Sequence, residues 1–582
     1  MHYAEHELER RVADTYATRS TATLKNSLYD SYKMAIRWAS DRIGEQGVIA
    51  FVTNGSWIDG NVDSGVRACL AEEFSSIWVL NLRGNQRTQG ERSRREGGKV
   101  FGQGSCAPVA ITILVRNPNA AHAGCRILYR DIGDYLKREE KLAVLRNAGS
   151  IAGIDDWREI TPDRHDDWLG QRAAAFQALY PMGSKAAKAG KSDEVIFRLY
   201  SRGLATSRDA YIYNFSRDAC AENARKMVGD YMGAMQTRQE HPECSVDDAV
   251  GLHSRYVRWD RELKNNLRRG RSVQYSVANI WVTQYRPFVK QHCYVEYSLV
   301  NNKYKQDSIF PPSESKLARL LAQGEPNRAI CVPGVGATRA FSALMVDRMP
   351  DLHCVSFGQC FPRYRYEPRG LFDDALVRVD NMTDTALATF RERYRDDSIS
   401  KDKIFDYVYG VLHAPAYRKR FANDLAKALP RVPVALDFDA FAAAGERLAE
   451  LHLGYEYCPE HPLEVVPAVP GKLRTRHYRL GDGAMRFDGD DKRVLIVNDH
   501  VRLPGIPQEA HGYVVNGRTP LEWFMDRYRV TRDGESGNLN DPNGWFAKPE
   551  DLIVAIRRVV HVSVETARIV AGLADPFDEE AS

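Results

Sequence analysis

The N-terminal part of the chain alternates between helical periodicity and short, fully apolar runs. Apolar residues recur at three- and four-residue spacing over 24–42, which predicts an amphipathic helix, and residues 66–73 predict a second helix. Unbroken apolar runs predict buried strands at 47–54, 77–82 and 109–115. Strands that alternate with helices favour a mostly parallel, doubly wound α/β sheet covered on both faces.

Such a sheet is expected to be incomplete here. A whole doubly wound domain needs about twice as many strand and helix units, and nothing before Leu24 supplies them. We therefore interpret residues 1–125 as the second half of a sheet domain and residues 126–195 as a connector, with an exposed Ala-, Gly- and Lys-rich stretch at 183–192.

The rest of the chain, residues 196–575, mixes the two periodicities. Short β-like runs occur at 329–332 and 352–357, residues 398–457 are strongly helical, and a helix is predicted from Pro549 to about Leu573. A large α+β domain is the simplest interpretation of this pattern.

Composition fits a folded protein and leaves the partner open. Hydrophobic residues make up 43% and charged residues 27%, and 81 Lys and Arg against 77 Asp and Glu give a net charge of only +4. The ten cysteines form no Cys-x-x-Cys pair, so we expect a reduced, cytoplasmic location and no metal site. No signal peptide and no run of ~18 apolar residues occurs, so no membrane is expected.

A basic stretch joins the predicted strands at 77–82 and 109–115. Residues 81–99 contain six Lys and Arg against two Glu, interleaved with Asn and Gln. The connection is far longer than the usual ~2–6 residues, and this composition suits contacts to phosphates and base edges. A plain solvated loop is the alternative. The candidate DNA-binding residues are Arg83, Arg87, Arg92, Arg94, Arg95 and Lys99.

A second basic stretch runs from Arg255 to Arg271, where Asp260 and Glu262 are the only acids. As a helix it would form a basic stripe with Trp259 and Leu263 on its packed side. Counterion release at a phosphate backbone would be its natural use, and an ordinary solvated helix face is an equal alternative.

Several catalytic and nucleotide-binding motifs are absent. Gly334 to Phe341 follows a strand-like run but lacks the third glycine and the acidic ribose ligand of a dinucleotide site, so a turn is the better interpretation. No P-loop, no Gly-x-Ser-x-Gly elbow and no His-Glu-x-x-His occurs, so serine hydrolase and zincin chemistry lack support.

Resemblance to a known family goes further than these patterns. Residues 19–32, 51–60 and 81–104 resemble the methyltransferase region of type ISP restriction-modification enzymes. Further similar segments are spread over nearly the whole chain: Tyr285 to Phe288, Cys360 to Pro362, Ile404 to His413, Leu448 to His452 and the neighbourhood of Trp523. The resemblance implies a partial doubly wound methyltransferase sheet followed by a target-recognition domain at 196–575.

In that family a nuclease and a helicase motor precede an adenine-N6 DNA methyltransferase and a target-recognition domain. The S-adenosylmethionine-binding glycine motif and the Asn-Pro-Pro-Tyr/Trp catalytic loop would lie before this sequence, and neither is present in it. That loop holds the amine of an adenine flipped out of the duplex, so we expect no catalytic residue and no S-adenosylmethionine binding by this chain alone. The resemblance also makes Phe101 the candidate that stacks on the flipped base, against the alternative of a core Phe at the start of a strand.

Three hypotheses follow. The first is sequence-specific recognition of double-stranded DNA. The second is methylation restored by a separately encoded upstream helicase/methyltransferase chain, since an unpaired buried-type strand edge favours a partner. The third is an inactive gene remnant.

Overall fold

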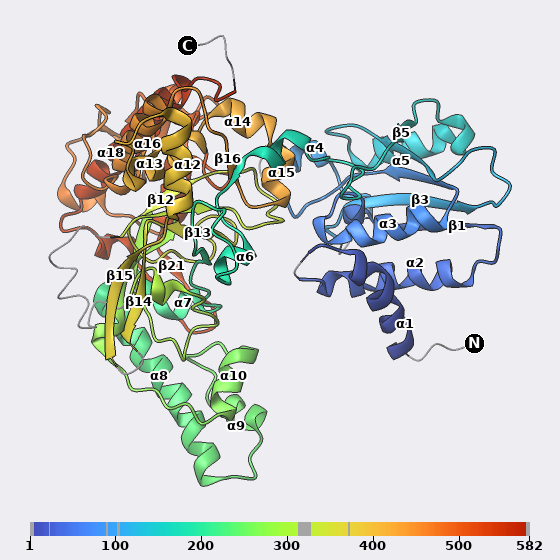
Figure 1. The fold of residues 1–582 in the computed structure, drawn as a ribbon. Helices are drawn as coiled ribbons and strands as arrows, with labels where there is room; N and C mark the ends of the chain where they lie inside the picture. The colour runs from blue at the N-terminus through green and yellow to red at the C-terminus, as the bar shows by residue number, and fades with distance from the viewer. Residues whose placement is uncertain are drawn as a thin grey trace. The chain divides into compact units, whose positions relative to one another are not determined.

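The chain forms two compact units, which Figure 1 draws with the N-terminal unit in blue. The computed structural model describes residues 5–22, 24–88, 91–101, 105–311, 327–370 and 373–577. Unit 1 comprises residues 1–176 with 426–428, and unit 2 comprises residues 177–425 with 429–582.

A five-stranded sheet in the order β1-β3-β2-β4-β5 lies at the centre of unit 1. Its strands are β1 (Gly47–Asn54), β2 (Ser76–Asn81), β3 (Val109–Arg116), β4 (Arg126–Asp131) and β5 (Arg158–Ile160). The three apolar runs found in the sequence are thus confirmed as strands.

The sheet is mixed and mainly antiparallel, so the expected mostly parallel arrangement is wrong. β3 runs antiparallel to both β1 and β2, β4 runs parallel to β2, and β5 runs antiparallel to β4. β1 and β2 do share a direction, because helix α3 (Ser64–Glu73) carries the chain from one to the other, but the chain then turns back and inserts β3 between them. Hydrophobic patterning reports that a strand is buried and says nothing of its direction.

The two faces of this sheet are covered unequally. On one face α1 (Glu5–Val12), α2 (Ser31–Arg42) and α3 enclose the main core of the unit. On the other, α5 (Arg138–Ala148) places Leu145 against Leu80 and Ile111. At β1 this second face is open: Val48 and Val52 are 65% and 56% exposed. The expectation of a sheet covered on both faces therefore fails at β1.

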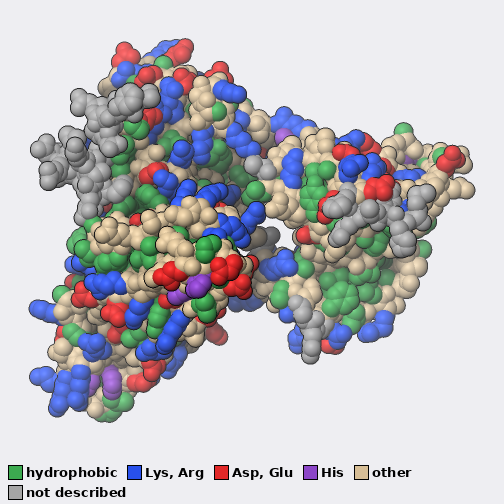
Figure 2. All heavy atoms as spheres, turned by 90° about the horizontal axis from the view of Figure 1, so that it is seen from below, with side chains coloured by type: hydrophobic (Ala, Val, Ile, Leu, Met, Phe, Trp, Pro, Cys, Tyr) green, Lys and Arg blue, Asp and Glu red, His purple; other side chains and the backbone are tan. Residues whose placement is uncertain are grey.

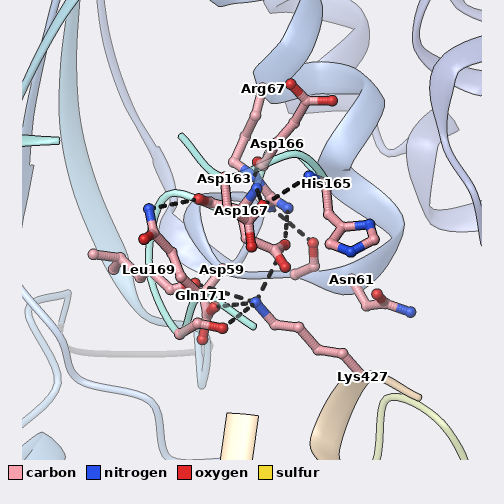
Figure 3. A network of polar contacts seen from close by, with 12 residues as sticks. Asp59, Asn61, Arg67, Asp163, His165, Asp166, Asp167, Leu169, Gln171 and Lys427 are labelled. Carbon is pink, nitrogen blue, oxygen red and sulfur yellow. Dashed lines mark hydrogen bonds and ion pairs between the residues drawn. The ribbon is translucent and has the colours of Figure 1, made fainter. Parts of the chain in front are cut away.

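Residues 126–176 belong to unit 1, although they were expected to be a connector. β4 and β5 add two strands to the sheet, and a buried polar network holds the segment that follows (Figure 3). Arg67 donates to the backbone oxygens of Trp57, Gly60 and Asp166 at 2.6–2.9 Å, and its Nη2 lies 3.0 Å from Asp167.

The Asp167 carboxylate also forms ion pairs with two other cations. Arg172 lies 3.1 Å and Lys427 Nζ 3.2 Å from it, and the same Lys427 donates to the carbonyls of Leu169 and Gly170. Because Arg67 and Asp167 are both fully buried, these bonds fix residues 163–172 onto the sheet domain. Composition alone made this segment look like a linker.

Unit 2 is an α+β assembly of small sheets and helices, as expected for this part of the chain. Its helices are α6 (Lys185–Lys188), α7 (Asp209–Ile212), α8 (Arg217–Glu240), α9 (Val246–Leu252), α10 (Arg261–Arg268), α12 (Asp384–Tyr394), α13 (Lys401–Val411), α14 (Pro415–Arg420), α15 (Ala422–Lys427, ending in unit 1), α16 (Phe438–Leu453), α17 (Pro520–Arg527) and α18 (Asp551–Ala571).

Most strands of unit 2 are short. They are β6 (Tyr180–Pro181), β7 (Ser201–Arg202), β8 (Tyr213–Asn214), β9 (Ile280–Arg286), β10 (Val289–Tyr294), β11 (Ala329–Val332), β12 (Leu344–Val346), β13 (Gln359–Pro362), β14 (Tyr364–Gly370), β15 (Asp373–Asp380), β16 (Arg431–Val432), β17 (Val466–Pro467), β18 (Arg486–Phe487), β19 (Val494–Ile496), β20 (Val501–Pro504), β21 (Thr531–Arg532) and β22 (Leu539–Asn540). The described pairs within them are all antiparallel.

Two local expectations have opposite outcomes. The turn predicted at Gly334 to Gly336 is confirmed, with Gly336 at φ +83°. The expectation of a strand at 352–357 is wrong, because these residues form consecutive turns, with Ser356 and Phe357 at positive φ, outside the β region.

The helical region predicted at 398–457 is confirmed, and its centre is the close pair α13 and α16. A Cβ on Gly445 would lie 1.7 Å from the backbone oxygen of Asp406, and a Cβ on Gly410 would lie 2.2 Å from that of Phe441. Only glycine permits this backbone approach. The pair brings Tyr409 against His452, so two segments distant in sequence form one buried wall.

Candidate nucleic-acid interface

The connection between β2 and β3 includes the short helix α4 (Glu91–Glu96). Antiparallel neighbours can be joined by two residues, so its length serves another purpose than turning the chain. Its described part is held by polar groups of the loop and of α5: Gly84 N–H donates to the Glu96 backbone carbonyl at 3.1 Å, and Lys141 Nζ of α5 donates to the same carbonyl at 2.7 Å.

Arg83 is part of this internal framework. It has a positive φ of 54°, its Nε lies 2.6 Å from Asp131, and its Nη1 lies 2.5 Å from Asp134. Burial by itself would lower the pKa of Arg83, but the hydrogen bond and charge of Asp131 outweigh it, so the pKa lies above its usual value. Because two carboxylates hold its guanidinium, Arg83 stabilises the loop. The proposed contact of Arg83 with DNA therefore loses support.

The other basic residues of the loop differ in accessibility. Arg87, Arg94 and Arg95 are exposed, and Arg95 Nε lies 4.0 Å from Asp134. Lys99 is half-buried, and the side chain of Arg92 lies outside the described residues. Among the described side chains of this loop, Arg87, Arg94 and Arg95 are the exposed cations.

Phe101 is also at the surface. Its side chain is 51% exposed, and β3 begins only at Val109, so the alternative of a core Phe at the start of a strand is wrong. An exposed aromatic ring in a connection that also carries exposed arginines suits stacking on a base. The stacking role itself stays a prediction.

In unit 2 the stretch from Arg255 to Arg271 forms a basic surface around α10. Asp260 caps this helix by accepting from Leu263 N–H at 2.8 Å, and its other oxygen lies 2.7 Å from the buried Arg208. Leu263 is buried and Trp259 stacks on Tyr231, so the predicted packed side is confirmed.

Six arginines of this stretch are exposed, and we call them the α10 surface: Arg255, Arg258, Arg261, Arg268, Arg269 and Arg271. Of these, only Arg269 has a described carboxylate partner, Glu262 at 3.9 Å. Figure 2 shows Lys and Arg side chains at several places on the face that it draws, with Asp and Glu among them. A local group of unpaired arginines is suited to phosphate contacts.

The comparisons with known proteins agree with this chemistry. A family model described as the Type ISP C-terminal specificity domain matches residues 195–554, more than half of the chain, and the chain therefore belongs to this family. No curated protein matches.

Solved structures of similar proteins cover nearly the whole chain. A nuclease-deletion mutant of the Type ISP restriction-modification enzyme LlaGI, in complex with a DNA substrate mimic, is 34% identical over 98% of this chain, with a TM-score of 0.84. The ATP-dependent Type ISP enzyme LlaBIII bound to DNA is 30% identical over 99%, with a TM-score of 0.85. A DrdV–DNA complex is 30% identical over 98%, with a TM-score of 0.83.

This chain spans only part of those proteins. It covers 50% of the LlaGI chain, 36% of the LlaBIII chain and 55% of the DrdV chain. None of the helices that the structure describes is long and apolar enough to cross a membrane.

Proposed function

We propose that this chain recognises a specific double-stranded DNA sequence, as the C-terminal part of a restriction-modification adenine-N6 methyltransferase. The match of residues 195–554 to a specificity domain carries the proposal. It is supported by relatives of 30–34% identity whose structures contain DNA or a DNA mimic.

Two surfaces have the chemistry that such recognition needs. In unit 2 the α10 surface would contact phosphates, which position a protein on DNA without reading its sequence. In unit 1 the loop cations Arg87, Arg92, Arg94, Arg95 and Lys99 would lie near the target adenine, and Phe101 would stack on the base when it leaves the duplex.

The test is selection of bound duplexes from a random pool, repeated at several salt concentrations, with the recovered sequences read. Enrichment of one short adenine-containing sequence is the expected result. Uniform binding that disappears with salt would show only a phosphate-binding protein and would contradict recognition. Aggregation without a discrete complex would favour the gene-remnant hypothesis.

S-adenosylmethionine does not fit the cavity that the structure describes on the sheet of unit 1. The cavity on its sheet, about 220 Å³, is lined by apolar side chains such as Trp78, Ile113 and Leu145, and its lining contains no carboxylate for ribose hydroxyls. We therefore assign the cofactor to the polypeptide that completes the sheet, and no methyl-transfer step to this chain.

A second candidate function is methylation together with such a completing polypeptide. The observation that favours it is the open side of β1. Among the described residues β1 pairs only with β3, and Val48 and Val52 stay exposed beside this free edge. Figure 2 also shows hydrophobic side chains on the surface of unit 1, at the right of the view. A polypeptide that adds a strand there would cover both features.

The test of this second function is reconstitution with an upstream helicase/methyltransferase chain. Transfer of a labelled methyl group from S-adenosylmethionine to duplex adenine is expected only when both polypeptides are present. Val52→Lys, which charges the open face, should abolish transfer but leave DNA selection by this chain intact. Methylation by this chain alone would contradict the assignment.

A further inference from the structure

Unit 2 contains a cavity of about 450 Å³ that is separate from the α10 surface. It lies between the start of α14, the end of α18 and the loops at 340–342 and 512–517. Most of its lining is apolar, from Phe341, Pro415, Val514, Ala567 and Val570, and the polar exceptions are Arg418, Ser342, Tyr513 and Asn516. An apolar cavity of this size with a few convergent polar groups is typical of small-molecule sites.

Arg418 is the only charged residue in this lining. Its Nε donates to the Leu412 carbonyl at 2.6 Å, and its guanidinium lies 5.9 Å from the centre of the Phe341 ring. Its Nη2 is buried with no hydrogen-bond acceptor, and no carboxylate of the described chain lies within ion-pair distance of it. A positive charge in such a place is unfavourable unless an anion compensates it.

The groups around Arg418 supply no negative charge. His413 and His452 are buried neighbours, and burial, with a further contribution from the Arg418 charge, lowers the pKa of both, so they stay neutral. Tyr513, stacked on His452, has a buried hydroxyl without a partner. Burial raises the pKa of this phenol, so it too stays uncharged. An oxyanion beside Arg418 would compensate the guanidinium charge and offer an acceptor to the unpaired Nη2.

The polar wall of the cavity is fixed before any ligand arrives. Asn516 has a φ of +50°, its N–H donates to Ser342 Oγ at 3.0 Å, and its side-chain amide donates to the carbonyls of His353 and Cys354 at 3.3 Å. Arg339 donates to the Asn516 carbonyl. A wall held in this way loses little conformational freedom on binding.

We propose that this cavity binds a small organic anion, with an apolar body against Phe341 and Val570 and one carboxylate or phosphate group on Arg418. The guanidinium would form charge-assisted hydrogen bonds to the oxyanion, for which its planar geometry is suited. This site is independent of the proposed DNA contacts.

The test is calorimetric titration of the full chain with benzoate, compared with the neutral isostere benzamide. Wild-type protein is expected to bind benzoate, and Arg418→Met to bind it about tenfold or more weakly, because the charge-assisted bonds are lost. Benzamide should bind both proteins with equal, low affinity. Equal benzoate affinity in wild type and Arg418→Met, or no benzoate binding at millimolar concentration, would overturn the proposal.

Two further variants keep the test independent of the stability of Arg418→Met. Ala571→Trp narrows the cavity at an exposed lining position while Arg418 stays, and it should also prevent benzoate binding. Lys419→Met removes a neighbouring exposed charge outside the lining and should bind as wild type does. Equal weakening by Lys419→Met would indicate a nonspecific charge effect, and competition by an unselected DNA duplex would assign Arg418 to a backbone phosphate; either result would overturn the proposal.

Discussion

Arg67 in unit 1 and Arg418 in unit 2 both have buried guanidinium nitrogens, but the surroundings of the two side chains differ. Arg67 is fully buried, with three backbone acceptors and the Asp167 carboxylate. Arg418 has one backbone acceptor and a buried nitrogen without any. Burial lowers the pKa of both, and only at Arg67 does a carboxylate oppose it. A compensated charge holds a fold together, whereas an uncompensated one beside a cavity indicates a missing ligand.

The largest expected effect is a loss of stability when Arg67, the compensated charge, is replaced. Arg67→Met would leave Asp167 buried beside fewer cations and three carbonyls without their donor, so the free energy of unfolding should fall by about 3–5 kcal/mol. Urea denaturation measures this change, and hydrogen exchange should rise over residues 163–172. Arg19→Met removes an exposed ion pair with Glu72 and should change the free energy of unfolding by less than about 1 kcal/mol. Equal effects of the two variants would contradict the structural role of the network.

Asp406 is an intermediate case, because it is 8% exposed and has one cation, Arg328, at 3.3 Å. Burial raises the pKa of Asp406 to about 6, from its ordinary 3.8, despite the opposing charge of Arg328. The folded state thus keeps a proton that the unfolded state loses. The contribution of protonated Asp406 to folding stability is fully present below about pH 4 and is lost as pH rises to about 6.

Asp406→Asn should therefore gain stability relative to wild type as pH rises. Between pH 4 and pH 7.5 the gain should reach at most about 3 kcal/mol, since each pKa unit corresponds to about 1.4 kcal/mol. Denaturation of both proteins at the two pH values measures it. A difference that is constant with pH would show that Asp406 titrates normally.

Exposed arginines without a described carboxylate partner test the same idea at positions where water already compensates the charge. Arg268→Gln combined with Arg271→Gln should leave stability unchanged but weaken binding to random duplex DNA about tenfold, and should lower the salt slope by about 2. Titrations at several salt concentrations measure both quantities. Arg447→Gln with Arg568→Gln is the matched control, because both arginines are exposed and each is paired with a glutamate three residues away on its own helix, α16 or α18. If the two double variants bind alike, the α10 surface does not contact DNA.

At Arg418, the uncompensated charge, only a small change in stability is expected. Arg418→Met should alter the free energy of unfolding by less than about 1 kcal/mol, or raise it slightly, because no carboxylate is left unpaired. The contrast with Arg67→Met is measured in the same denaturation series. A loss as large as that of Arg67→Met would mean that Arg418 is structural and would remove the main argument for the anion site.

The candidate DNA interface was only partly predictable from the chain. The sequence located the basic loop and the α10 surface, since clustered arginines are visible without a structure. It could not separate Arg83 from Arg87, because the partners of Arg83, Asp131 and Asp134, lie about fifty residues further on. Arg418 gave no sequence signal at all: it stands in an ordinary helical stretch, and its lack of a carboxylate emerges only when three distant segments enclose it.

By itself the sequence determined the three apolar strands at 47–54, 77–82 and 109–115, the helical region at 398–457, the C-terminal helix and the family that the chain resembles. Local periodicity and composition carry that information, since each element must match its own burial. The tertiary structure alone decided the direction of β3, the inclusion of residues 126–176 in unit 1 and the identity of the compensated charges. All three depend on which distant segments meet. Strands form hydrogen bonds with one another, and a buried charge gains a compensating partner, only after those segments have come together.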